Sequence, residues 1–476
     1  MLIAVIVVPL FFAATAWLLP SHRMRSLMLP LGSGLHLLLS ILLICQPPVR
    51  NHAWIGLDDL SRLILLVTAV LFFACAVYGL DYLNLRVDRD NHIMVSCLLV
   101  FLSAMTLAVL SRHLGLLWVA VETTTISSAP LIYFNRNALS IEATWKYLLI
   151  CSVGIALAML GILFVGYALL GNGSEVSLQL DTLLAEAPHM AGPWLHAGFV
   201  FLLVGFGTKM GLAPLHTWKP DAYGEAPGLV GALLAGCLTS VAFLAILRGV
   251  QLMGAAGDLD MARHALLGMG LLSLTLAAIF VIRQTDIKRM LAFSSVEHMG
   301  ILAIGVGIGG IATFGAMLHL INNALTKGSL FLAAGNIHRA HASKKMSGIH
   351  GAMARLPLSG GLFLAGFLAI TGSPPFGPFL SEFTILRGVF AGEHYLIGAL
   401  ALALLATVFI GMGSTVLAVT QGEADPTLKD NGFRDRLLLV APPLLLLLIV
   451  LMLGLYLPEP LSRLLRGAAA LIEVQP

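Results

Sequence analysis

Residues 205–228, GFGTKMGLAPLHTWKPDAYGEAPG, place ionisable side chains inside an apolar segment. Lys209 has apolar and glycine residues on both sides, and a lysine at the centre of a bilayer costs about 2.5–3.5 kcal/mol. Pro214 removes a helix hydrogen bond, and a broken helix at membrane depth needs protein or water to satisfy the freed backbone groups. We therefore expect an internal hydrated site here rather than a helix that faces lipid.

Two acids lie in similarly apolar surroundings. Glu122, in LLWVAVETTTISSAP, is flanked by small hydroxyl residues that can hydrogen-bond across helices or hold water. Glu382 lies near the end of a second proline-rich stretch, TGSPPFGPFLSEF at residues 371–383, beyond its three prolines, and occupies a position that corresponds to Lys209 in the other half of the chain. We expect both acids to take part in ion movement; a purely structural polar contact is the alternative.

A polar stripe marks residues 311–335. His319, Asn323 and Lys327 follow one another at intervals of four, so they share one face of a helix. Such a stripe on an otherwise apolar helix predicts a hydrogen-bonded path, with helix-packing contacts as the alternative.

Five further residues allow two interpretations each. Lys146 is near the start of a helix and either acts in ion movement or extends to the membrane interface. His298 is either a satisfied core histidine or a member of a proton relay. His216, Asp221 and Glu225 follow the break after Lys209, where they form either the mouth of a site or an ordinary capped loop. Aspartates at the ends of spans, including Asp58, are expected to be solvated.

The composition indicates an integral membrane protein. Of 476 residues 58% are hydrophobic and 11% charged, and the mean hydropathy is +0.94, whereas a soluble protein has about 25% charged residues. A net charge of +3 gives no reason to expect a nucleic-acid partner. The five cysteines are scattered singly, so we expect no disulfide, cluster or metal site. Phosphate-loop, zinc-protease and nucleophile-elbow motifs are lacking in the sequence, which disfavours an ATP-driven pump or a membrane hydrolase.

Apolar runs long enough to cross a bilayer predict an all-α, polytopic protein with about 14 transmembrane helices. The seventh and twelfth spans are interrupted by proline and glycine, which is typical of two inverted five-helix repeats, helices 4–8 and 9–13. We divide the chain into residues 1–91 (helices 1–3), 92–253 (first repeat), 264–420 (second repeat) and 421–476 (helix 14 and a short tail). The spans lie near residues 1–20, 27–46, 62–83, 92–110, 114–134, 143–170, 194–215, 228–253, 264–283, 290–309, 311–335, 356–390, 394–420 and 437–457.

Basic residues predict the orientation. Residues 1–20 have no basic segment of the signal-peptide kind, so we expect them to form the first span. Lysine and arginine are about twice as frequent in loops that follow odd-numbered spans, with Lys219 counted in the loop after the seventh. This bias predicts that those loops are cytoplasmic and that both termini are outside.

Four stretches carry a resemblance to a known family: KMGLAPLHTWKPDAYGEAP at 209–227, TDIKRMLAFSSVEHMG at 285–300, HLINNALTKGSLFLAAG at 319–335 and PPFGPFLSEF at 374–383. They resemble the antiporter-like membrane subunits of respiratory complex I, of Mrp cation/proton antiporters and of energy-converting nickel–iron hydrogenases. The runs VETTTISSAPLIYF and EATWKYLLICSVGIALAMLG are most similar to the F-type component of hydrogenase 4.

The resemblance implies roles for several residues. Glu122 matches the glutamate of the family's fifth helix, Lys209 the lysine of its seventh, and Glu382 the acidic variant of its twelfth-helix position. His319 and Lys327 fall on the polar positions of the eleventh helix. The chain departs from the family in its eighth helix, where Ser240 stands at about the place of a common lysine.

Together these observations predict a proton-translocating, antiporter-like subunit of a multi-subunit redox complex, with no cofactor or redox centre of its own. Its partners would be other membrane subunits and peripheral subunits with iron–sulfur clusters and a nickel–iron centre, where the electrons flow. The alternative is a subunit of a cation/proton antiporter or ion-coupled uptake system without a redox partner. A third interpretation, favoured by Ser240, is a membrane scaffold with an inactive channel.

Overall fold

The computed structural model describes residues 1–476 except 48–52, 171–176, 191, 283, 423–431 and 474–476. Within the described residues the regular structure is helical, and the β-type pairing there consists of isolated bridges. The predicted all-α fold class is confirmed.

The N-terminal half contains the first eight predicted spans and one short surface helix. These elements are α1 (Leu2–Leu18), α2 (His22–Cys45), α3 (Asp59–Asn84), α4 (His92–Leu110), α5 (Leu114–Ile132), α6 (Ala138–Leu170), the surface helix α7 (Leu180–Glu186), α8 (Gly192–Met210), α9 (Trp218–Glu225), α10 (Gly228–Leu233), the π-helical turn η3 (Leu234–Leu238) and α11 (Thr239–Ala255).

The C-terminal half continues the same pattern. Its helices are α12 (Leu259–Val281), α13 (Ile287–Ile308), α14 (Ile311–His341), α15 (Ala352–Arg355), α16 (Pro357–Ile370), α17 (Gly377–Ala391), α18 (Tyr395–Thr420), α19 (Leu437–Leu455) and α20 (Glu459–Ala470). Short 3-10 turns are η1 (Tyr133–Asn135), η2 (Ala187–His189) and η4 (Met346–Gly348).

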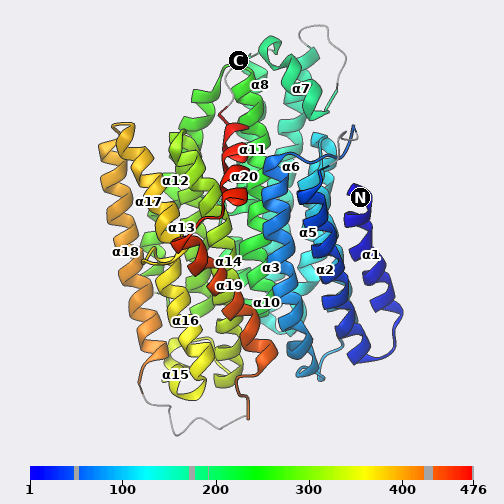
Figure 1. The fold of residues 1–476 in the computed structure, drawn as a ribbon, viewed down its shortest axis with the longest axis vertical. Helices are drawn as coiled ribbons and strands as arrows, with labels where there is room; N and C mark the ends of the chain where they lie inside the picture. The colour runs from blue at the N-terminus through cyan, green and yellow to red at the C-terminus, as the bar shows by residue number, and fades with distance from the viewer. Residues whose placement is uncertain (48–52, 171–176, 191, 283, 423–431, 474–476) are drawn as a thin grey trace.

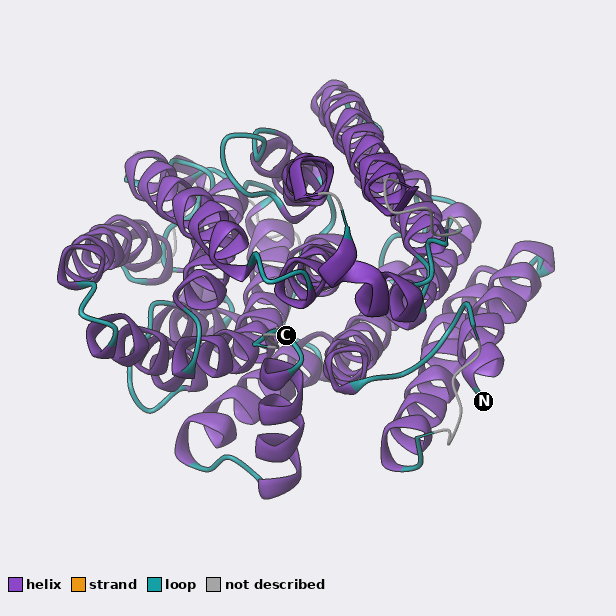
Figure 2. Cartoon of the chain, turned by 90° about the horizontal axis from the view of Figure 1, so that it is seen from above, coloured by secondary structure: helices purple, strands orange, loops and turns teal. Residues whose placement is uncertain are grey.

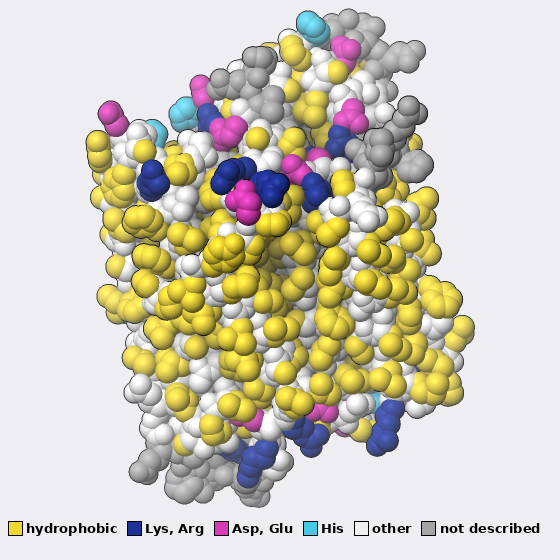
Figure 3. Space-filling view, in the orientation of Figure 1, with side chains coloured by type: hydrophobic (Ala, Val, Ile, Leu, Met, Phe, Trp, Pro, Cys, Tyr) yellow, Lys and Arg dark blue, Asp and Glu magenta, His cyan; other side chains and the backbone are white. Residues whose placement is uncertain are grey.

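The fourteen predicted spans correspond to α1–α6, the pair α8/α9, the continuous run α10–α11, α12, α13, α14, the pair α16/α17, α18 and α19. Ten described helices are long and apolar enough to cross a membrane, and α1 and α16 are shorter apolar helices. Hydrophobic side chains cover the middle of the molecule, while charged side chains gather toward its two ends (Figure 3). This distribution is that of a protein embedded in a bilayer.

Both predicted interruptions are confirmed. The break in the seventh span lies between α8 and α9, and that in the twelfth lies between α16 and α17. At each break a glycine just after the first half-helix takes a left-handed backbone conformation, with φ of +82° at Gly211 and +67° at Gly372. Glycine adopts this conformation at little cost and commonly ends helices, so these two residues stop α8 and α16.

The long helix α14 lies at the centre of the bundle. It packs against α13, α16, α17 and α19, and also against α10 and α3 of the N-terminal half (Figure 1). Seen from above, most helices run side by side as one bundle (Figure 2). Because α14 contacts both halves, its polar side chains can interact with groups of either half.

Three expectations need correction. The segment 171–193, taken for a loop, contains α7, and the C-terminal tail contains α20, which packs on α3 and α14. Asp58 is not simply solvated: it caps α3 through the Ser61 amide at 2.8 Å and pairs with Arg248 of α11 at 2.6 Å. The ion pair ties α3 to α11, and the side chain of Asp58 is only 17% exposed.

Candidate functional site

Lys209 ends α8 and is fully buried. Its ammonium group donates hydrogen bonds to the hydroxyl of Thr125 on α5, at 2.8 Å, and to that of Tyr147 on α6, at 2.7 Å. Thr125 in turn donates to the carboxylate of Glu122 at 3.0 Å. One hydroxyl therefore connects the lysine and the glutamate that the sequence singled out.

Glu122 is at the middle of α5 and is partly exposed on the outer surface of the bundle. The exposed Ser152 of α6 donates to its other oxygen at 3.4 Å. Neighbouring side chains on this surface are apolar and exposed, among them Ile126 and Val153. A carboxylate at mid-bilayer depth that reached lipid would be costly, so this face needs a polar cover.

The break after Lys209 is held by hydrogen bonds to its backbone. The indole of Trp218 donates to the carbonyl of Thr208 at 2.9 Å, and the Ala213 amide donates to Ser273 at 2.9 Å. These bonds satisfy groups that a continuous helix would have paired. His216 lies in the break, is 5% exposed and packs edge-on against the ring of Phe293.

A second cluster joins α13, α14 and α17. The imidazoles of His298 and His319 are hydrogen-bonded, Nδ1 to Nε2, at 3.0 Å, and the other nitrogen of His319 bonds to Ser381 at 3.0 Å. The carboxylate of Glu382 lies 3.9 Å from Nδ1 of His298. All four side chains are buried, so a proton shared by them would be shielded from bulk water.

Lys327 and Glu297 extend this cluster. The Lys327 ammonium donates to the carbonyl of Leu291 at 3.3 Å and lies within electrostatic range of Glu297. The Glu297 carboxylate accepts a hydrogen bond from Ser294 at 3.2 Å and lies 3.9 Å from Nε2 of His298. Asn323, between His319 and Lys327 on α14, is buried as well.

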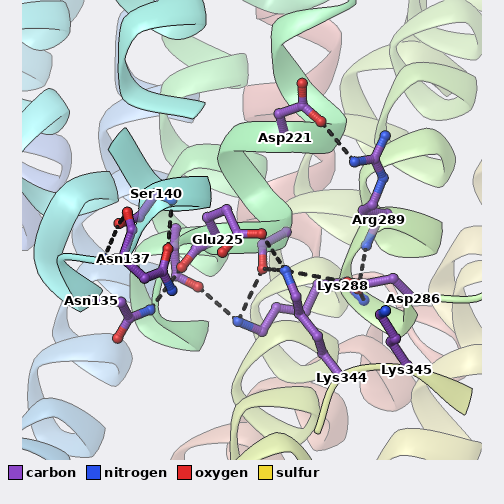
Figure 4. Close-up of polar contacts among 12 residues, drawn as sticks. Asn135, Asn137, Ser140, Asp221, Glu225, Asp286, Lys288, Arg289, Lys344 and Lys345 are labelled. Atoms are coloured by element: carbon purple, nitrogen blue, oxygen red, sulfur yellow. Dashed lines mark hydrogen bonds and ion pairs between the residues drawn. The ribbon is translucent and has the colours of Figure 1, made fainter. Parts of the chain in front are cut away.

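The candidates Lys146, Asp221 and Glu225 lie together at the end of the bundle where the loops after the odd-numbered spans are found. Asp221 accepts from Lys146 at 2.9 Å. Asp221 also accepts from Arg289 at 2.7 Å, and Glu225 pairs with Lys344 (Figure 4). These side chains line a cavity of about 580 Å³ that opens to the surface. Lys146 is 45% exposed at its rim, which is how an interfacial lysine behaves.

Lys219 differs from what the sequence indicated, whereas Ser240 lies inside the eighth predicted span as expected. Lys219 was counted with the loop charges, yet its side chain is fully buried beside the break. Ser240 is buried in α11 and donates to the carbonyl of Gly236 at 2.6 Å, so its hydroxyl is engaged by its own helix.

His298, His319 and Glu382 each offer a ligand atom, and these atoms lie within 4.8 Å of one another. Two imidazoles and a carboxylate are a donor set that zinc accepts. The same three groups are also the kind that pass a proton along hydrogen bonds.

Sequence reasoning missed Thr125, Tyr147, Ser381 and Glu297. Three of them are uncharged groups that become functional candidates only through their partners on other helices. Glu297 carried a usable signal, since it directly precedes His298 inside an apolar span.

Broken helices and buried ionisable groups in a membrane bundle define a class of proteins, membrane subunits that translocate ions. Comparison with known sequences narrows the class: the profile of the family described as "NADH:quinone oxidoreductase/Mrp antiporter, TM" matches residues 111–411. The chain belongs to this family and is an antiporter-like membrane subunit of the complex I, Mrp and hydrogenase-4 type.

Individual relatives agree with that assignment. A "Hydrogenase-4 component F homolog" from Methylacidiphilum infernorum is 33% identical over 96% of both chains. A sodium/proton antiporter component of Alkalihalophilus pseudofirmus is 25% identical over 85% of this chain and 80% of its own. A chain of respiratory complex I from Thermus thermophilus has the same fold, with a TM-score of 0.83 at 24% identity, over 99% of this chain and 100% of its own.

Proposed function

We propose that the chain moves protons through two buried clusters, one at Lys209 and Glu122 and one at Lys327, His298, His319 and Glu382. The observation that carries the proposal is the fully buried Lys209 ammonium, which is linked to Glu122 through a single hydroxyl. Burial penalises the charged form of Lys209, and the opposite charge of Glu122 stabilises it. Movement of one therefore changes the proton affinity of the other.

The first cluster acts as a switch in this mechanism. While Glu122 is ionised and close, it holds the lysine protonated. When the carboxylate is protonated or moves away, Lys209 releases its proton toward the central helix. His216, which lies in the break beyond Lys209 and is buried, would be the next titratable group to accept this proton.

The second cluster passes the proton on. Lys327 exchanges protons with Glu297, and the carboxylate lies near the outer nitrogen of His298. The bonded imidazoles of His298 and His319 then connect it to Glu382. Asp221, Glu225 and Lys146 line the cavity at the end of the bundle with the loops that follow odd-numbered spans, and a proton would enter there.

We further propose that residues 92–253 and 264–420 form the two repeats, each with one cluster, flanked by residues 1–91 and 421–476. The family's complexes suggest a bacterial inner membrane, and the basic loops suggest that both termini face outside. In this orientation the cavity lined by Asp221, Glu225 and Lys146 opens to the cytoplasm.

The chain would work inside a redox complex of the hydrogenase-4 type. Two observations support partners: the relative from Methylacidiphilum infernorum aligns over 96% of both chains, and the outer face of α5 and α6 exposes Glu122. A neighbouring membrane subunit with a polar group at that depth would cover the carboxylate. Electron transfer would take place in peripheral subunits with iron–sulfur and nickel–iron centres.

A cation/proton antiporter without redox partners is the second candidate. It is favoured by the similarity to the sodium/proton antiporter component of Alkalihalophilus pseudofirmus over 85% of this chain. Purification through a tag on this chain separates the two candidates. Co-purified iron, nickel and peripheral subunits support the redox complex, whereas membrane subunits without these metals support the antiporter.

Proton movement itself can be measured in vesicles that contain the purified complex. A potassium diffusion potential set with valinomycin drives the flux, and a pH-sensitive dye inside the vesicles reports it. Lys209→Met should abolish the flux, while Arg463→Met, at a position on α20 that is 73% exposed and lies outside the cavity that Asp221 lines, should leave it unchanged. Equal flux in both variants would contradict the proposal.

A further inference from the structure

Lys219 is a buried lysine that the two proposed clusters do not use. It lies in α9 just beyond the helix break, and its side chain is fully buried. Its ammonium nitrogen has no hydrogen-bond partner among the described residues; its closest aromatic contact is the ring of Tyr223, with the nitrogen 5.8 Å from the centroid. A buried charge without a hydrogen bond costs several kcal/mol in general, so this position needs an explanation.

The other almost fully buried lysines behave differently. Lys209 donates to two hydroxyls, Lys327 to the carbonyl of Leu291, and Lys288 to the carbonyl of Ala226 at 2.9 Å. A lysine kept for structure would be expected to have such partners, because unpaired buried polar groups are destabilising. Lys219 therefore does not fit a structural role.

The backbone makes room for this side chain. Lys219 lies across Gly211, the residue that ends α8 at the break. A Cβ atom at position 211 would lie 2.2 Å from the Cε atom and 2.6 Å from the Nζ atom of Lys219. The glycine thus serves two purposes: it stops the helix and leaves the space that the lysine fills.

Lys219 is placed between the two clusters. On one side, Cys151 of α6 is within electrostatic range of both Lys209 and Lys219. On the other side, Lys327 is within electrostatic range of Lys219. The rings of Tyr147, Trp218 and Tyr223 follow one another at 5.0 and 5.9 Å along this route.

We infer that Lys219 carries the proton from the Lys209 cluster to the Lys327 cluster. This inference rests on the proposed function. In the step, a proton leaves the Lys209 ammonium, Lys219 changes from amine to ammonium, and the same proton then moves to Lys327. Because Lys219 and Lys327 repel each other when both are charged, the second transfer requires that Lys327 has already passed its own proton on.

The test replaces Lys219 in the intact complex and measures proton flux in the vesicles described above. Lys219→Met should lower the flux by about tenfold or more. The amount of assembled complex should be unchanged, because the substitution removes a buried amine that has no hydrogen-bond partner among the described residues. Lys219→Gln keeps a polar group of similar size but cannot carry a proton, so it should fail equally.

A replacement that can still carry a proton tests whether titration at position 219 is what the flux requires. Lys219→His should restore part of the flux, with its pH profile shifted to the acid side, because imidazole titrates well below an amine. A structural or water-holding lysine predicts that Gln is tolerated as well as His. That result would overturn the inference.

Two reference variants separate this inference from the proposed function. Lys288→Met removes a partnered buried lysine and should reduce assembly, so it calibrates a structural loss. Lys209→Met should stop the flux. If Lys209→Met stops the flux and Lys219→Met does not, the inference fails and the proposed function stands; if neither variant affects the flux, the proposed function itself fails.

Discussion

The hydroxyl of Thr125 connects Lys209 to Glu122, so its removal tests whether the pair works as a unit. Thr125→Val keeps the shape of the side chain and deletes two hydrogen bonds, one of 2.8 Å from the ammonium and one of 3.0 Å to the carboxylate. Hydrogen bonds to charged groups contribute about 1.5–3 kcal/mol each. The two bonds lie in series between Lys209 and Glu122, so the coupling through them is limited to about the contribution of one bond. Lys209 keeps its bond to Tyr147, and Glu122 keeps that from Ser152.

A loss of about 1.5–3 kcal/mol in coupling corresponds to a decrease in proton flux of about ten- to a hundredfold. The assay is the dye measurement in vesicles under a potassium diffusion potential, with the amount of assembled complex determined in parallel. Thr124→Val is the matched control. Thr124 is the adjacent buried hydroxyl on the same helix, and it donates to the carbonyl of Val121 in its own helix.

The two valine variants should therefore differ in flux and agree in assembly. If Thr125→Val transports normally, the hydroxyl link does not matter and the switch mechanism is wrong. If both variants lose flux together, the effect comes from the packing of α5 rather than from the link.

Three further predictions concern the switch, a surface ion pair and the topology. Lys209→Arg should lose proton flux almost as fully as Lys209→Met, because arginine stays charged; normal flux in the arginine variant would refute a titrating lysine. Although burial raises the pKa of Asp58, the Arg248 ion pair lowers it well below its usual range. Asp58→Asn should thus destabilise the protein by about 3 kcal/mol above the ordinary aspartate pKa, and the deficit, read from thermal unfolding midpoints, should shrink as the pH falls through the lower pKa of the folded state. Single cysteines at Ser343 and Ser177 should react with impermeant reagents from the cytoplasmic and the outer side respectively, and reversed labelling would overturn the orientation.

The membrane class, the fourteen spans and the two interruptions could be predicted from the sequence because they depend on local properties. Twenty apolar residues are enough to cross a bilayer wherever they pack, and Pro214 weakens a helix in any surroundings. An ionisable residue in an apolar run is costly before any contact is known, which is why Glu122, Lys209 and Glu382 stood out.

The partners of these residues were decided by the tertiary structure. Thr125, Tyr147 and Ser381 are ordinary polar residues until helices far apart in sequence bring them within hydrogen-bond distance of Lys209 and His319.

The position of Lys219 also could not be predicted from the sequence. Lys219 follows the seventh predicted span, which ends near residue 215, so its charge was counted in the loop. Whether a lysine near a break points to water or into the bundle depends on which helices close over it. The sequence alone therefore determined which ionisable residues lie inside the apolar spans. Only the packing of α9 beside Gly211 decided that Lys219 is buried as well, without a hydrogen-bond partner among the described residues.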